Sequence, residues 1–138
     1  MNLGYACINS TLSDQKPKIT TNRTMVKKTF IEKGINYASE LSLLNVADLS
    51  TILKWNVDNG IKFFRLSSEV FPWASEYNLS DLPKYNAISK LLSDAGDFAI
   101  KNELRITSHP GPFNVLVSPR QNVIDNTIKD LCIHGDMF

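Results

Sequence analysis

The order of apolar and polar positions along the chain predicts three short β-strands. The first covers residues 3–8, an apolar run that reads as a buried strand, and the second covers residues 61–66. In the third, Leu104 and Ile106 alternate with polar residues, as expected for a strand with one buried face. The two prolines and the glycine of residues 110–112 cannot continue a strand, so the chain must turn there.

Apolar residues that recur every three or four positions predict a helix after each of the last two strands and one before them. The first helix begins with Asn45 as its N-cap and is closed by Gly60. The second begins around Lys84, and the third follows Ser118, an N-cap residue with proline directly after it. Residues 10–44 show no clean period and are expected to form a long loop.

Strand–helix units repeated in this way predict an α/β protein with a parallel sheet. Residues with chemically useful side chains gather after the strands: Asn9 after the first, residues 67–76 after the second, and residues 109–114 after the third. Such a one-sided distribution is typical of the catalytic face of a (β/α) barrel. The sequence contains no glycine-rich nucleotide-phosphate loop and no GxSxG nucleophile motif.

His109 is the most distinctive candidate residue, because it stands where the third predicted strand leaves the sheet. The C-terminal end of a strand is where α/β proteins place catalytic groups, and an imidazole there can titrate or bind a metal. The alternative is a surface histidine beside a turn. Taken alone, the residue supports both interpretations equally.

Composition indicates an ordinary globular domain, with 138 residues, 43% apolar residues and a net charge of +1. Basic side chains outnumber acidic ones in residues 10–44, which form either a phosphate-binding segment or a solvated loop. No apolar run approaches the ~20 residues of a membrane span, and we see no signal pattern. Cys7 and Cys132 do not have a zinc-binding spacing, so we expect a cytoplasmic protein with reduced thiols.

Several motifs, in order along essentially the whole chain, resemble those of the ultraviolet-damage endonuclease family (UVDE, also called UvsE). No single motif is decisive, but the combination is specific. The matching stretches are Leu3-Gly4-Tyr5 with Asn9, Thr21-Asn22-Arg23-Thr24, Asn45-Val46 with Asp48-Leu49, Phe64-Arg65-Leu66-Ser67-Ser68, Phe71-Pro72-Trp73-Ala74-Ser75, His109-Pro110-Gly111 with Phe113-Asn114-Val115-Leu116, and Ser118-Pro119.

The resemblance implies a TIM (β/α)8 barrel, a fold that needs roughly 250 residues. Residues 1–138 would then be the N-terminal portion of a single barrel domain, with about the first three βα units. The resemblance also implies an enzyme of DNA repair, a metal-dependent endonuclease that cleaves the DNA backbone 5′ to ultraviolet photoproducts.

A cluster of divalent metals is the cofactor that the resemblance implies, with manganese expected and magnesium or zinc as alternatives. His109 matches a metal ligand of the family and is the candidate catalytic residue. Glu76 stands where several members have a metal-binding histidine, and a carboxylate also suits Mn²⁺. Metal bound at such a site can activate water and clamp the scissile phosphate.

Ultraviolet-damaged DNA is the partner that the resemblance implies. Tyr5 and Asn9 match positions near the damaged nucleotides, and Phe113 matches an aromatic position that probes the lesion. Pro112 replaces a lesion-probing glutamine of many members, so any base contact there is expected to be apolar. The basic segment supplies candidates for a phosphate-binding rim. These are Asn22, Arg23, Lys27 and Lys28.

Three βα units leave a sheet with an open edge at the third strand, and we expect Tyr5, Phe64 and Ile106 on an apolar inner face without partners. The isolated chain is therefore expected to be inactive and to need the C-terminal half of the barrel, or to self-associate. One alternative is another metal-dependent TIM-barrel enzyme, such as an abasic-site endonuclease or a sugar isomerase. The other is a non-catalytic half-barrel that binds DNA.

Overall fold

A parallel three-stranded sheet organises the chain in the computed structural model, which describes residues 3–112 and 114–138. The strands are β1 (Gly4–Ala6), β2 (Phe63–Leu66) and β3 (Arg105–Ser108), and they lie side by side in the order β1-β2-β3. Both strand pairs are parallel, as the repeated strand–helix pattern predicts. The α/β fold class is therefore confirmed.

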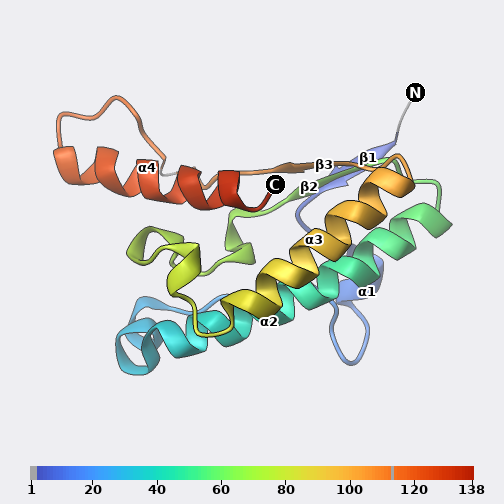
Figure 1. Ribbon diagram of the computed structural model, residues 1–138, viewed down its shortest axis with the longest axis horizontal. Helices are drawn as coiled ribbons and strands as arrows, with labels where there is room; N and C mark the ends of the chain where they lie inside the picture. The colour runs from blue at the N-terminus through green and yellow to red at the C-terminus, as the bar shows by residue number, and fades with distance from the viewer. Residues whose placement is uncertain (1–2, 113) are drawn as a thin grey trace.

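Within residues 3–112 and 114–138, four α-helices and three short 3-10 helices connect and follow the strands. They are α1 (Ser10–Ser13), α2 (Lys27–Asp58), η1 (Ser68–Val70), η2 (Ala74–Glu76), η3 (Leu79–Asp81), α3 (Tyr85–Lys101) and α4 (Gln121–Asp136). Figure 1 shows α2 and α3 side by side along one face of the sheet, whereas α4 lies beyond the C-terminal ends of the strands. The segment after β2 packs against α4 through η2. No helix among the described residues is long and apolar enough to cross a membrane.

The apolar core fills the space between the sheet and the helices α2 and α3. Tyr5, Phe64 and Ile106 are register partners on adjacent strands, so their side chains share one face of the sheet. Phe64 is fully buried in the core cluster, and Tyr5 and Ile106 pack against that cluster. The expectation of an apolar inner face without partners is therefore wrong for these three residues, because they form the helix-covered face.

No helix of the described residues covers the opposite face of the sheet, which we call the open face (Figure 1). It consists of two rows of register partners, Gly4, Phe63 and Arg105 in one and Ala6, Arg65 and Thr107 in the other. The Arg105 guanidinium lies over the Phe63 ring, 5.6 Å from its centre. A side chain at Gly4 would collide with Phe63, whose Cδ1 lies 2.5 Å from the position a Cβ would take, so glycine is required there.

Helix α1 occupies residues 10–13 and helix α2 begins at Lys27, so the long loop expected over residues 10–44 is wrong at its start and over its second half. The sequence does not show the helical period of apolar residues because the buried face of α2 is partly polar. Its polar residues Ser39, Ser42 and Asn45 are fully buried. Gly34 interrupts the helix with a positive φ of 62°, and its backbone conformation separates two helical stretches.

Asn45 is not an N-cap, because it lies well inside α2 with its side chain buried. The other predicted boundaries are closer to the structure. Gly60 has a φ of 69° directly after the end of α2, as its predicted closing role requires. Helix α4 begins at Gln121, two positions later than Ser118-Pro119 predicts. The first strand is shorter than expected. It is also more exposed, since Tyr5 is its one half-buried residue.

Candidate functional site

His109 follows the last residue of β3, where the chain leaves the sheet. Its backbone N–H still donates to the Leu66 carbonyl at 2.7 Å, so its backbone is fixed although its side chain is exposed. Glu76 closes η2 and is exposed as well. Imidazole and carboxylate suit Mn²⁺, but the described residues contain no group of three or more His, Cys, Asp or Glu arranged to hold a metal. The metal role of these two residues stays a prediction.

Tyr5 and Asn9 lie together, but their polar groups already have partners inside the protein. The Tyr5 hydroxyl donates to Asn56 Oδ1 at 2.7 Å and accepts from Asn9 Nδ2 at 2.8 Å. Asn9 also caps α1, accepting from the Leu12 N–H at 3.0 Å. Burial raises the pKa of Tyr5 above its ordinary value of 10.0, and the two asparagine hydrogen bonds oppose that rise. The hydroxyl is therefore neutral near pH 7, and the network ties β1 to α2.

Asn22 joins the C-terminal ends of two neighbouring strands. Its Nδ2 donates to the Cys7 carbonyl, directly after β1, at 3.0 Å. Its Oδ1 accepts a hydrogen bond from the hydroxyl of Ser67, directly after β2. Because one amide side chain bridges both strand ends, the rim of the sheet is held in a fixed shape. The structure gives Asn22 this role in addition to its predicted place in a phosphate-binding rim.

Both Nη atoms of Arg23 are engaged by partners within the protein. Nη1 donates to the Thr20 carbonyl at 2.6 Å and Nη2 donates to the Lys18 carbonyl at 2.8 Å. Nη2 also forms an ion pair of 2.7 Å with Asp48 of α2. By contrast, Lys27 and Lys28 at the start of α2 are exposed. The ion pair of Lys28 Nζ with the Glu32 carboxylate is long, at 3.9 Å. Among the basic rim candidates, these two lysines are exposed, whereas Arg23 is half-buried and paired with Asp48.

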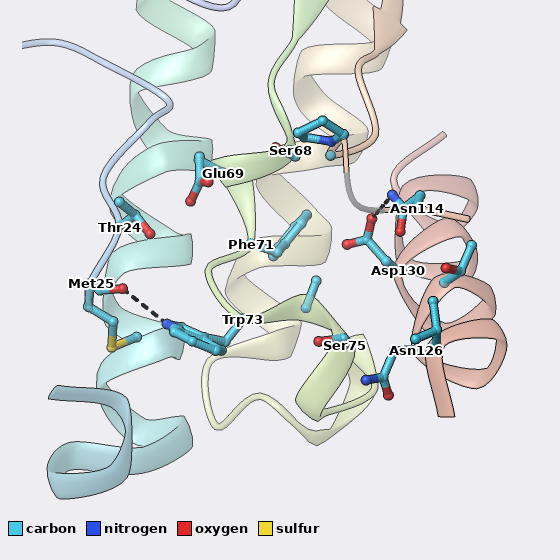
Figure 2. A pocket seen from close by; sticks show the side chains of 15 residues that line it. Thr24, Met25, Ser68, Glu69, Phe71, Trp73, Ser75, Asn114, Asn126 and Asp130 are labelled. Carbon is cyan, nitrogen blue, oxygen red and sulfur yellow. Dashed lines mark hydrogen bonds between the residues drawn. The ribbon is translucent and has the colours of Figure 1, made fainter. Parts of the chain in front are cut away.

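A pocket of about 500 Å³ opens between the segment after β2 and helix α4. Figure 2 shows Thr24 and Met25 on one side of it and Asn126 and Asp130 on the other. Pro112 is part of the lining, and Phe113 lies outside the described residues. The pocket therefore brings together the segments after β2 and β3, as a barrel face requires.

The aromatic side of this pocket is built around Trp73. Its backbone has a φ of 62°, an uncommon conformation for a bulky residue. Its indole N–H donates to the Met25 carbonyl at 3.0 Å, and its ring stacks on Phe30 with centres 5.5 Å apart. The neighbouring aromatic residues Phe71 and Tyr77 are buried in the core.

A polar group on the α4 side of the pocket was missed by sequence reasoning. Asn114 Nδ2 donates to Asp130 at 2.5 Å, and the imidazole of buried His134 lies 3.8 Å from the same carboxylate. Burial lowers the pKa of His134, Asp130 opposes this effect, and His109 adds to it. The signal available in the sequence was the four-residue spacing of Asp130 and His134, which puts them on one face of a helix.

Comparison with known proteins gives a consistent result across sequence and structure. The sequence model of the family described as UV-endonuclease UvdE matches residues 1–138. The UV-damage endonuclease of Schizosaccharomyces pombe is 35% identical over 136 residues, which are 99% of this chain and 22% of that protein. The UV DNA damage endonuclease of Clostridium perfringens is 30% identical over 139 residues, which are 100% of this chain and 31% of that protein.

A solved structure, the crystal structure of SacUVDE, superposes on the chain with a TM-score of 0.79 and 32% sequence identity. The match covers 99% of this chain and 44% of that one. The chain thus spans less than half the length of the relatives it matches. The expectation of a partial TIM barrel, with a parallel sheet as its first strands, is confirmed.

Proposed function

The chain belongs to the UV-endonuclease UvdE family, and on this premise we propose that it acts in DNA repair, in an endonuclease that cleaves ultraviolet-damaged DNA. The observation that carries the proposal is the match of the family model to residues 1–138. The names of the relatives from S. pombe and C. perfringens, both endonucleases of UV damage, support the same activity. They favour it over a sugar isomerase or an abasic-site endonuclease.

The finer part of the proposal is cleavage 5′ to the photoproduct with a divalent metal, manganese first. His109 supports it by its position at the C-terminal end of β3, where the ring is exposed. Glu76 is the second proposed ligand. Since these two residues do not form a three-ligand group among the described residues, the proposed centre depends on ligands from the part of the relatives that this chain does not cover.

Contacts to the damaged DNA are proposed at the rim of the sheet and at the turn after β3. Lys27 and Lys28 are exposed at the start of α2, where they can meet phosphate. Pro112 offers an apolar surface at the pocket, and Phe113 is proposed as the lesion probe. Tyr5, Asn9, Asn22 and Arg23 are proposed to support this surface, since each has a hydrogen-bond partner that fixes a strand end or the segment before α2.

The experiment compares binding and nicking of supercoiled plasmid that is irradiated, unirradiated or abasic. The 138-residue chain is tested alone and joined to the remaining portion of the C. perfringens relative, with Mn²⁺ or with EDTA. We expect the chain alone to prefer irradiated plasmid without nicking it. The joined protein is expected to nick only irradiated plasmid and only with Mn²⁺.

His109→Ala in the joined protein is expected to abolish nicking and keep the preference for irradiated DNA in binding. Equal binding of irradiated and unirradiated plasmid by both forms, together with no nicking, would contradict the proposed function. Nicking of abasic plasmid alone would favour the abasic-site alternative. Nicking that persists in EDTA would refute the metal part only.

A further inference from the structure

Arg65 stands on the open face of the sheet, near the C-terminal end of β2. Its neighbours in the chain, Phe64 and Leu66, are 0% and 2% exposed on the helix-covered face. Side chains alternate along a strand, so Arg65 projects to the other face, where it is exposed. Its register partners there are Ala6 and Thr107. Neither is large enough to cover a guanidinium.

The arginine is fixed at its backbone and at the inner end of its guanidinium. Its carbonyl accepts from the Cys7 N–H at 2.7 Å, which pins β2 to the end of β1. Its Nε donates to the Ser108 carbonyl across the sheet at 3.4 Å. Ser108 is the last residue of β3, and His109 is the next one. The guanidinium is therefore held at the point where the proposed metal ligand leaves the sheet.

The outer part of the guanidinium has no partner in the part of the chain that the structure describes. Neither Nη1 nor Nη2 of Arg65 takes part in a hydrogen bond or an ion pair with described residues. Arg23 differs, because both of its Nη atoms are taken by backbone carbonyls and by Asp48. An arginine with a fixed stem and a planar fork left open matches the geometry of a phosphate group, which accepts two parallel hydrogen bonds.

We propose that Arg65 binds a phosphate group of the DNA backbone beside His109, an inference that rests on the proposed function. Arg65 lies on the open face near the C-terminal ends of the strands, where α/β barrels place their reacting groups. Arg65 would position the DNA strand that is to be cut.

Arg105 is the matched control that the chain provides. It lies on the same open face and carries the same charge, but it stands at the start of β3, the opposite end of the strands. Its guanidinium lies over the Phe63 ring. If positive charge promotes DNA binding in general, replacing Arg65 and replacing Arg105 should weaken binding equally. If a phosphate site lies at the C-terminal ends of the strands, only the replacement of Arg65 should weaken it.

The first experiment measures binding of the chain to a duplex with one thymine photoproduct, by fluorescence anisotropy at several salt concentrations. Arg65→Gln is expected to weaken binding roughly tenfold, the typical effect of one hydrogen bond to a charged group. It is also expected to lower the slope of log affinity against log salt by about one. Arg105→Gln is expected to leave both quantities unchanged. Arg65→Lys is expected to keep the slope and still bind more weakly.

The second experiment follows the arginine Nε–H signals of the wild-type chain by NMR during titration with inorganic phosphate. The Arg65 signal is expected to shift, and the Arg105 signal is not. This measurement needs no variant, so it stands even if Arg65→Gln fails to fold. Equal losses from the two glutamine variants, or an Arg65 signal that does not respond to phosphate, would overturn the site.

The two experiments also separate this site from the proposed function. If the chain binds damaged DNA and Arg65→Gln keeps the full affinity and salt slope, the site is wrong and the function stands. If the Arg65 signal responds to phosphate and the chain shows no preference for irradiated DNA, the phosphate site stands and the function is wrong.

Discussion

Replacing Asn45 by alanine is expected to destabilise the fold strongly, although an exposed helix would gain from the same change. Asn45 is 0% exposed in the middle of α2. Its Oδ1 accepts from the Arg23 N–H at 2.9 Å. Its Nδ2 lies within hydrogen-bond distance of three carbonyls, those of Arg23 at 3.0 Å and of Glu69 and Val70 at 3.1 Å each.

The magnitude follows from which of these partners water can reach. Glu69 is exposed and Arg23 is half-buried, so their carbonyls can find water after the substitution. Val70 is 1% exposed, and the Arg23 N–H points at the buried amide, so both are left unpaired. Each such loss costs about 1–3 kcal/mol. The higher helix propensity of alanine returns about 0.5 kcal/mol. The net loss of unfolding free energy is therefore about 2–5 kcal/mol.

Urea unfolding followed by circular dichroism measures this loss. Asn59→Ala is the control, because the Asn59 amide also donates to a backbone carbonyl, that of Trp55 at 2.8 Å, but in an exposed position. The control is expected to change the free energy of unfolding by less than about 1 kcal/mol. A result in which both variants lose the same amount, or in which Asn45→Ala unfolds like the wild type, would refute the assigned role of this amide.

Two further predictions concern close packing and pH. Gly4→Ala should lower the free energy of unfolding by about 1–3 kcal/mol because its methyl group would collide with Phe63, whereas Gly96→Ala in α3 meets nothing within 4 Å and should be neutral or stabilising; equal urea midpoints would contradict this. Burial lowers the pKa of the His134 imidazole from 6.5 in the folded chain. As the pH falls, the imidazole of the unfolded chain is therefore protonated first, and stability present above pH 6.5 is lost below it. Urea midpoints measured between about pH 5 and 8 should fall with falling pH in the wild type and fall less in His134→Gln. If the midpoints of the two proteins fall by the same amount, His134 is not the cause of the loss.

The sequence predicted those elements whose buried face is apolar. In α3 the buried residues Ile88, Ala95 and Ala99 recur at helical spacing, and the helix was predicted close to its observed range. Strand β3 follows the alternation of apolar and polar residues, and β2 lies within the predicted run of residues 61–66. These signals are local, since each depends only on residues a few positions apart.

The elements that were missed depend on polar groups with distant partners. Helix α2 buries Ser39 and Asn45, and their hydrogen bonds run to Lys84 and to residues 23, 69 and 70. A buried polar side chain is stable only when it is paired. The pairing here joins residues 22–45 positions apart, which no window of the sequence contains. The local sequence therefore predicted the Asn45 side chain to be a helix cap.

The candidate site shows the same limit. The sequence indicated His109 and the basic segment of residues 10–44, but it could not show that Arg23 is engaged with Asp48. Nor could it distinguish Arg23 from Arg65, since both stand in motifs that resemble the family. The difference lies in whether the guanidinium has partners in the fold, and those partners come from other elements.

The direction of the side chains in β2 also changes how the sheet can be covered. Alternation predicted that every second residue shares a face, but not which face meets the helices. The helices cover the row with Phe64, which leaves Arg65 and Arg105 on the open face. Two copies of the chain that met through this face would bring arginines against arginines, a like-charge contact that costs free energy. Self-association, which stays a prediction, would therefore have to use the open strand edges, where unpaired backbone groups remain.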